Sequence, residues 1–476
     1  MSARYLLSVI GACVVLSAHA QQFAGLSLNN YSAVQQMPYN PAWVCNADRG
    51  TELHLFSVSG LVGTNAYTLS KGWLTRAVTG QNQGEPVEDK DYEKNQLNGY
   101  KKYLWGNVDA LGPAVSLRLR PNIFVGAYIR ARQVVNGGNF TKEALQFIGD
   151  QQQIIMSQPA ALSKAGFTLH AFTELGVTYG AILKDDGYHR WYAGATLKYL
   201  SGIAAGSVYA GNVDLQIDHA DTSAHVTGDL SVKYSTSIRK LTDGGGDNNL
   251  SSWLNGGQKH SFGLDLGVRY EYHPDYNPNH ETPYLFSIAA SITDIGRIRY
   301  MADTGSALYE MDLTSNTVSQ QQNKPAGQAG PSTGNGGGGV VLPVDSLLQK
   351  KGGPGSFRVG LPTAFRLNAD LQLGSGFAIA ADVLLNLQST KRGIYNPGYA
   401  NTYCFTPRFE RKGFMIGVPF CFVHHQQMTA GAVMRVGPVF IGSSSLISCA
   451  ITNHVNVLDG YAGVCLKFKP HNRQTY

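Results

Sequence analysis

The sequence predicts an all-β fold, a transmembrane antiparallel β-barrel of about 14 strands with an N-terminal luminal segment. Composition is the first observation: glycine occurs 55 times in 476 residues, and only 15% of residues are charged, against roughly 25% in soluble domains. The second is that no run approaches the roughly 18 apolar residues that a membrane-spanning helix needs. The third is an alternation of apolar and polar residues that recurs along the chain.

The alternation is clearest in one predicted hairpin. Apolar and polar residues alternate through Ala114–Arg120 and again from Ile123 to Ala131, on either side of Pro121-Asn122. A Pro-Asn pair between two such runs predicts a tight turn. Many runs are about nine to eleven residues long, the length of a tilted strand that crosses a bilayer. Further runs are Val213–His219, Val226–Tyr234, Phe262–Tyr272, Phe365–Leu373, Phe377–Leu387 and Tyr461–Phe468.

Charged residues recur on the polar faces of these runs. A soluble β-sandwich also alternates, but about 14 strands would make a very large sandwich. A barrel in lipid needs apolar residues outside, polar residues inside and a closed sheet, so that every backbone group has a partner. We therefore favour the barrel. The charged residues are Arg118, Arg120, Asp229, Lys233, Asp265, Arg269, Glu271, Arg366, Asp370, Asp382, Arg435 and Lys467.

The N-terminus has the pattern of a secretory signal peptide over residues 1–20. A basic residue precedes a short apolar run, and Ala18-His19-Ala20 is a small-x-small cleavage site. We therefore expect one barrel domain over residues 21–476. A lipoprotein alternative rests on Cys13 in IGAC, but apolar residues continue after that cysteine and the Ala-His-Ala site fits better.

The last predicted strand contains a glycine with apolar residues at the third and fifth positions after it, Gly463, Leu466 and Phe468. This pattern resembles the last-strand signal that the barrel-assembly machinery recognises, and that machinery is therefore an expected partner. Many barrels stop at this aromatic residue. Here PHNRQTY follows, so Tyr476 is an alternative terminal aromatic.

Three segments do not alternate. Lys71–Lys102 is polar and charged, and Phe140–Leu162 contains TKEALQFIGDQQQII, which predicts a short amphipathic helix. Met301–Gly355 is rich in Gly, Gln, Pro and Ser, a composition that cannot bury a core and predicts a low-complexity loop (residues 301–355). A fourth stretch, MPYNPAWV (Met37–Val44), is neither ordinary helix nor strand, because its two prolines remove backbone donors and fix φ.

The sequence YNPAW at residues 39–43 resembles the Asn-Pro-Ala motif near the start of FadL-type long-chain fatty-acid transporter barrels. The resemblance implies that Gln22–Ala47 (22–47) is a luminal hatch whose Asn-Pro-Ala region anchors it to the wall. Asn40 would then cap a turn through its side chain. The alternative is that Pro41 merely breaks the chain before the first strand. The implied hatch residues are Tyr39, Asn40, Pro41, Ala42 and Trp43.

Five further motifs resemble a family of Bacteroidota outer-membrane barrels, the domain of unknown function 5723. The resemblance covers nearly the whole mature chain. It implies an outer-membrane barrel distantly similar to the FadL type, and it supplies no activity. The motifs are GATLKYLSG (Gly194–Gly202), GLDLGVRYEY (Gly263–Tyr272), SITDIGRIRY (Ser291–Tyr300), LPTAFRLNADL (Leu361–Leu371) and RVGPVFIGSSSL (Arg435–Leu446).

The sequence offers no constellation for catalysis. Phosphate-binding glycine loops, zinc-protease helices and nucleophile elbows are absent from it, so we expect no enzyme and no cofactor. His424-His425 would point to opposite faces of a strand and could not chelate one metal. Asp243–Asp247 begins like a calcium loop, but Leu254 stands where an acidic residue is needed. A net charge of +6 without a basic run gives no reason to expect nucleic acid. Candidate lumen carboxylates are Glu174, Asp265, Glu271 and Asp382.

Two pairs of cysteines flank predicted hairpins. Cys404 and Cys421 would face each other on the lumen side of neighbouring strands, as would Cys449 and Cys465. They are candidate disulfides, because the cell envelope permits oxidation. The alternative, which we slightly favour, is that they are reduced and act as small packing residues. Cys45 is left over in either case.

The leading hypothesis for function follows from the FadL-type resemblance: passive movement of a small molecule across the outer membrane. The molecule is unidentified, and hydrophobic molecules are among the candidates. Tyr39–Trp43 would gate the lumen. The competing hypothesis is a non-transporting envelope scaffold or a protein-secretion accessory barrel, since some FadL-like barrels serve secretion. In either case the chain is expected in the outer membrane, in contact with its lipid. A positive luminal field that favours acidic ligands is expected from Arg118, Arg120, Arg130 and Arg132.

Overall fold

The computed structural model describes most of the chain after its N-terminal region. Four features discussed above lie outside the described residues: the signal peptide, the calcium-like stretch 243–247, His424-His425 and the C-terminal Tyr476. The described residues are 23, 25–26, 34–49, 51–70, 92–94, 101–140, 154–156, 160–218, 223–238, 260–275, 284–315, 340–342, 349–353, 355–388, 395–411, 413–423 and 428–468.

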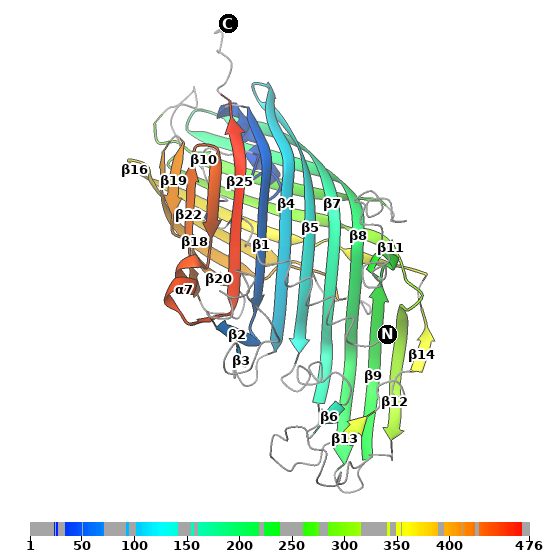
Figure 1. Cartoon of the computed structure of the whole chain (residues 1–476). Coiled ribbons are helices and arrows are strands. Elements are labelled where there is room, and N and C mark those ends of the chain that lie inside the picture. The colour runs from blue at the N-terminus through cyan, green and yellow to red at the C-terminus, as the bar shows by residue number, and fades with distance from the viewer. Residues whose placement is uncertain are drawn as a thin grey trace.

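Fourteen antiparallel strands of the described chain form a closed barrel, which confirms the predicted fold (Figure 1). Each strand pairs with the next along the chain, and β1 (Glu52–Thr64) closes the wall against β25 (Val457–Lys467). The other uninterrupted wall strands are β4 (Lys102–Arg120), β5 (Ile123–Phe140), β7 (Ala160–Asp185), β8 (His189–Asp218), β17 (Phe377–Asn386), β18 (Thr402–Arg411) and β23 (Val439–Ser443).

The remaining wall strands are built from pieces that follow one another along the same neighbour. Both β9 and β10, for example, pair with β8 at different heights. The pieces are β9 (Ser223–Tyr234) with β10 (Ser261–Tyr272), β11 (Phe286–Met301) with β12 (Ala307–Ser315), β14 (Gln349–Gly352) with β15 (Ser356–Gly360) and β16 (Ala364–Gly374), β19 (Phe414–Gly417) with β20 (Phe420–Val423), and β21 (Met428–Ala430) with β22 (Ala432–Val436).

Two predictions about irregular segments need correction. Strands β12 and β14 lie within Met301–Gly355, so part of the predicted low-complexity loop extends the wall instead. In Phe140–Leu162, β6 (Ile154–Met156) is a strand paired with β13 (Val340–Leu342), and the rest of the predicted helix, residues 141–153, lies outside the described chain. Cross-strand pairing outweighs the helical pattern at β6, because a short isolated helix is marginal in water.

Smaller elements complete the structure. A three-stranded sheet consists of β2 (Tyr67–Ser70), β3 (Tyr92–Lys94) and β24 (His454–Val455). The named helical elements among the described residues are η1 (Pro41–Arg49) and α7 (Leu446–Ile451). None of the described helices is long and apolar enough to cross a membrane.

The two ends of the barrel differ in their connections. Tight turns such as 375–376 and 437–438 join the strands at one end, and Gly376 and Gly437 there have φ of +92° and +56°, which suits glycine. Connections at the other end are longer, residues 65–101 for example. We call these the short-turn end and the long-loop end. Outer-membrane barrels place short turns in the periplasm, so the long-loop end, where β8 and β9 extend furthest, faces outward (Figure 1).

The polarity of the wall is inverted relative to a soluble protein. On β10, Asp265, Arg269 and Glu271 are buried inside, while Phe262 and Val268 on the outer face are 65% and 50% exposed. Exposed apolar side chains cover the outside of the other wall strands in the same way. Burial of charges beneath an apolar exterior is favourable only if the exterior faces lipid.

Aromatic side chains border this apolar surface. Near the short-turn end, the ring centroid of Tyr270 lies 4.7 Å from that of Trp191 and 5.8 Å from that of Phe286. On the side of the apolar surface that faces the long-loop end, the ring centroids of Tyr199 and Phe262 are 5.9 Å apart. The strand from Trp191 to Tyr199 is roughly 26 Å long. At a tilt of roughly 40° this length spans about 20 Å along the membrane normal, most of the roughly 25 Å apolar band between the aromatic girdles of outer-membrane barrels.

Candidate functional site in the lumen

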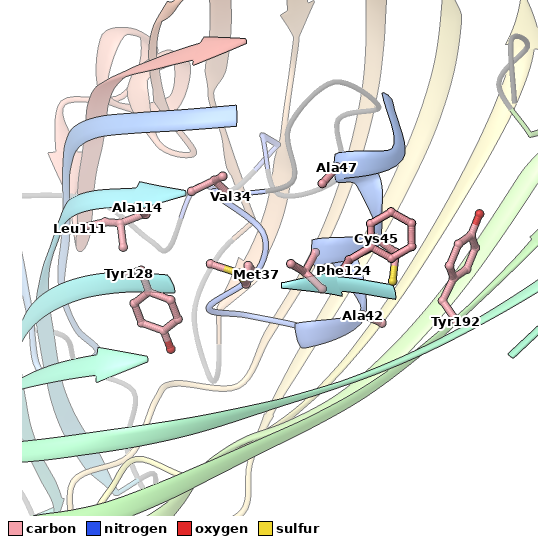
Figure 2. Close-up of a cluster of buried hydrophobic side chains, with 11 residues drawn as sticks. Val34, Met37, Ala42, Cys45, Ala47, Leu111, Ala114, Phe124, Tyr128 and Tyr192 are labelled. Carbon is pink, nitrogen blue, oxygen red and sulfur yellow. The ribbon is translucent and has the colours of Figure 1, made fainter. Parts of the chain in front are cut away.

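The segment that precedes the first strand lies inside the barrel. Residues 34–47 are all buried, and we call them the hatch segment. Pro41 begins η1, a position where its fixed φ and missing N–H cost nothing. Figure 2 shows how the apolar side chains of the hatch segment meet the wall. The cluster consists of Val34, Met37, Ala42, Val44, Cys45 and Ala47 from the hatch segment, and Leu111, Ala114, Phe124, Tyr128 and Tyr192 from the wall.

A row of glycines on the inner wall makes room for the hatch segment. Gly180 of β7, Gly194 of β8 and Gly267 of β10 pair directly across three neighbouring strands. A Cβ on Gly194 would lie 2.5 Å from the carbonyl carbon of Pro41, and a Cβ on Gly180 would lie 2.9 Å from the Cys45 sulfur. Any side chain at these positions would displace the segment. We call this row the glycine groove.

Asn40 fixes the hatch backbone in the groove. Its Oδ1 accepts a hydrogen bond from the Ala42 N–H at 2.9 Å, which caps the turn into η1. Its Nδ2 donates to the carbonyl oxygens of Val268 at 3.4 Å and Ala290 at 3.3 Å, on two wall strands. The Ser291 hydroxyl donates a hydrogen bond to the Tyr39 carbonyl oxygen at 2.8 Å. The hatch therefore satisfies its polar groups at the wall.

Tyr39 lies between two wall arginines. The guanidinium carbons of Arg130 and Arg366 are 5.0 Å and 4.9 Å from the centre of its ring, within cation–π range. Its hydroxyl donates to Asp109 Oδ2 at 3.4 Å. Burial, assisted by the Asp109 charge, raises the pKa of the Tyr39 hydroxyl well above its usual value, so the hydroxyl stays protonated.

Trp43 makes the same kind of contact one turn further on. The guanidinium carbon of Arg269 is 4.4 Å from the Trp43 ring centre and 4.1 Å from that of Tyr192. Arg269 also donates to the Asn46 side-chain oxygen at 2.6 Å. Luminal arginines thus hold both aromatic residues of the Tyr39–Trp43 stretch.

A buried ion cluster occupies the wall beside the hatch segment. Lys198 Nζ lies 2.7 Å from carboxylate oxygens of both Asp265 and Asp294, and 3.7 Å from Glu174. Asp294 sits at a bulge with φ of +63°, which directs its carboxylate inward, and its N–H donates to Asp265 at 2.6 Å. Buried charges of this kind are tolerated only when they are paired.

Two arginines extend the ion cluster across the lumen. Arg130 contacts Asp109 through a short ion pair and reaches Glu174 at 3.2 Å. Arg132 binds Glu174 at 3.1 Å and Asp294 at 2.6 Å. The cluster combines the cations Arg130, Arg132 and Lys198 with the anions Asp109, Glu174, Asp265 and Asp294.

A second segment enters the lumen from the long-loop end. Residues 395–401, the inner loop, connect β17 to β18. The Asn136 side chain donates to the Gly398 carbonyl oxygen at 2.6 Å and accepts from the Gly398 N–H at 2.8 Å. The Tyr399 hydroxyl accepts a short hydrogen bond from Arg132. The inner loop begins Tyr-Asn-Pro, the same three residues with which the hatch motif begins.

The predicted positive luminal field is wrong. Arg118 and Arg120 lie at the tip of β4 beside the short turn, where both are exposed and Arg118 donates to the Arg120 and Pro121 carbonyls. Arg130 and Arg132 do point inward, but the carboxylates of the ion cluster balance them. Alternation alone gives the face of a residue and not its height along the barrel, which explains the error.

The other predicted residues are placed as follows. Leu466 and Phe468 lie on the outer face at the end of β25, with Gly463 inward against Phe440. Tyr39, Asn40, Pro41, Ala42 and Trp43 are all buried in the lumen. Glu174 and Asp265 belong to the ion cluster, while Glu271 lies 3.4 Å from Arg269. Asp382 acts electrostatically on Arg366.

The first cysteine pair differs from the expectation in its redox state; the second is not disulfide-bonded, as favoured, but differs in position. Cys404 and Cys421 form a disulfide between β18 and β20, whereas reduced residues were favoured. Cys449 lies on α7 and not on a strand, so it does not face Cys465, whose strand neighbour is His54. A short helix in the connection before β25 was not visible as a break in the alternation.

Sequence reasoning missed the glycine groove, the inner loop, and the luminal residues Asp109, Asp294 and Lys198. Glycines within strands are a signal for close backbone approach, and Gly180, Gly194 and Gly267 all stand in otherwise strong strands. That signal identifies the glycines but not the segment that they contact.

Fold and site together define the class of protein: an outer-membrane β-barrel whose lumen is occupied by its own N-terminal segment. Residues 41–444 match the model of the family of unknown function DUF5723, so the chain belongs to that family. The resemblance expected from the sequence motifs is confirmed. None of the curated proteins matches the sequence.

Several solved structures are similar to the chain at low identity. The Pseudomonas putida toluene transporter TodX has 9% identity and a TM-score of 0.37, over 94% of this chain and 96% of that one. A Pseudomonas aeruginosa FadL homologue has 10% identity and a TM-score of 0.28, over 96% and 98%. The translocator domain of the Neisseria meningitidis autotransporter NalP has 9% identity and a TM-score of 0.32, over 88% of each chain.

Proposed function

We propose that the protein is a passive channel for a small molecule across the outer membrane, with the hatch segment as its gate. The observation that supports this most is that the wall closes by itself, because β1 pairs with β25 without any hatch residue. The hatch segment is held by packing, hydrogen bonds and cation–π contacts. The disulfide in the described chain, Cys404–Cys421, joins two wall strands. The hatch can therefore leave while the barrel stays intact.

The lining that the hatch would uncover suits small molecules without a strong charge. The ion cluster has near-balanced charges, so it provides sites for hydrogen bonding without a strong net field. Toward the long-loop end the inward-facing side chains are apolar and pack against one another, so the passage of a molecule there would also require these side chains to move apart. The apolar residues there are Phe172, Leu200, Ala205, Ile298, Tyr300, Phe357, Val359 and Leu361.

Single-channel conductance in a planar bilayer tests the proposal, with the wild-type barrel compared with a deletion of residues 22–47. We expect the wild type to be closed for most of the recording and the deletion to conduct steadily. Folding of the deletion variant is checked on a gel in detergent. A folded barrel migrates at a different position when the sample is not heated than after heating. A folded deletion variant that never conducts would contradict the channel.

The second candidate is a non-transporting envelope scaffold or secretion accessory. The inner loop favours it, because Tyr399 and Gly398 pack against the wall from the side opposite the hatch. The long projection of β7 and β8 past the membrane band also offers surface for a partner. In this case the barrel stays closed after deletion of residues 22–47, which is the opposite of the outcome expected for a channel.

A further inference from the structure

The outer face of β11 changes character abruptly near the long-loop end. Ile288, Ile292 and Ile295 face outward and are exposed, as expected of lipid-facing residues. The next two outward positions are Arg297 and Arg299, both exposed. The bulge at Asp294 shifts the alternation by one residue, and without that shift these two arginines would point into the lumen. The local backbone thus directs them outward.

A third arginine completes a cationic patch on the same face. Arg358 of β15 pairs directly with Arg299 of β11, and Arg297 is one step along the diagonal. Side chains directly opposite on neighbouring strands have Cβ atoms about 5 Å apart, and like charges there destabilise the pair. We call Arg297, Arg299 and Arg358 the guanidinium patch.

The guanidinium patch lacks a carboxylate partner within the described chain. None of the ion pairs among the described residues involves its three arginines. The Ser356 hydroxyl accepts hydrogen bonds from Arg299 Nε at 3.0 Å and from Arg299 Nη2 at 2.8 Å. Arg297 donates no hydrogen bond to a carboxylate among the described residues. Three adjacent positive charges on one exposed face therefore leave a site for an external anion.

The height of the patch indicates the kind of anion. The Ser261 hydroxyl donates to the Arg297 carbonyl oxygen at 2.6 Å, which places Arg297 beside the start of β10. The next residue of β10, Phe262, belongs with Tyr199 to the aromatic border on the side that faces the long-loop end. The patch therefore begins where the apolar band ends, at the level of the outer leaflet headgroups.

We propose that the guanidinium patch binds the phosphate group of an anionic lipid in the outer leaflet. Guanidinium groups bind phosphate oxygens through paired N–H donors, and three of them can surround one phosphate. The acyl chains of such a lipid would run along the exposed Ile295 and Ile292 below the patch. A free anion in solution would gain nothing from this apolar surface, which is why a lipid is the expected ligand.

The test uses the full-length folded barrel in an uncharged detergent and measures lipid binding by native mass spectrometry. The probes are diphosphorylated lipid A, the same lipid after removal of its phosphates, and inorganic phosphate. The variant is Arg297→Gln/Arg299→Gln/Arg358→Gln. The matched control is Arg118→Gln/Arg120→Gln, which removes exposed arginines at the opposite end of the barrel. The single variant Arg299→Gln serves if the triple variant folds poorly.

We expect the wild type and the control to bind diphosphorylated lipid A with the same affinity. Each arginine near a membrane surface contributes about a fivefold affinity, so the triple variant should lose about a hundredfold and Arg299→Gln about fivefold. The dephosphorylated lipid should bind the wild type as weakly as the intact lipid binds the triple variant. Equal binding by wild type and triple variant overturns the site. Equal saturation by inorganic phosphate overturns its assignment to a lipid.

Discussion

Replacement of Gly194 by alanine tests whether the glycine groove holds the gate. The added Cβ would lie 2.5 Å from the Pro41 carbonyl carbon and 2.6 Å from the Ala42 nitrogen, which are backbone atoms and cannot rotate away. Ordinary contacts are about 3.5 Å, so the hatch segment must retreat by about 1 Å. Overpacking of this kind costs about 1–3 kcal/mol, and that cost falls on the closed state alone. The open-to-closed ratio should rise by about 5- to 150-fold.

The assay is the open probability of single channels, with wild type, Gly194→Ala and the deletion of residues 22–47 recorded under the same conditions. Gly460→Ala is the matched control, because this strand glycine has open space around the added Cβ. We expect Gly460→Ala to behave as wild type and Gly194→Ala to lie between wild type and the deletion. If Gly194→Ala and Gly460→Ala open equally rarely while the deletion conducts, the glycine groove does not hold the gate.

Two further predictions concern stability. Lys198→Met leaves Asp265 and Asp294 buried without their shared cation, so the free energy of unfolding in urea should fall by about 3–5 kcal/mol. The control is Lys184→Met at an exposed position, which should lower the free energy of unfolding by less than about 1 kcal/mol. Equal losses in the two variants would contradict a stabilising role of the ion cluster. Burial, assisted by Tyr103, raises the pKa of Tyr395 in the inner loop to about 12. Between about pH 10 and pH 12 the unfolded chain therefore loses this proton while the folded barrel keeps it, and stability should fall by roughly 2 kcal/mol more in the wild type than in Tyr395→Phe. Identical pH profiles of urea unfolding for these two proteins would show that the inner loop is not buried.

The sequence alone predicted some residues of the luminal site but not the contacts between them. YNPAW identified the hatch residues through a resemblance, and alternation placed Arg130 and Arg132 on the luminal face. Their partners were not predictable: Arg132 meets Asp294 and Tyr399, which are 162 and 267 residues away along the chain. Such pairs depend on how the strands are staggered around the closed barrel, and no local pattern encodes that stagger.

The sequence by itself determined the class of fold and the orientation of most wall residues, because a strand in a bilayer must alternate with period 2 and a closed sheet must satisfy every backbone group. The tertiary structure alone decided what fills the lumen. Gly180, Gly194 and Gly267 form a groove only when three strands pair in one register, and Asp294 points inward only because a bulge reverses the alternation there. The same bulge turns Arg297 and Arg299 toward the lipid, since a shift of one residue moves every following side chain to the opposite face.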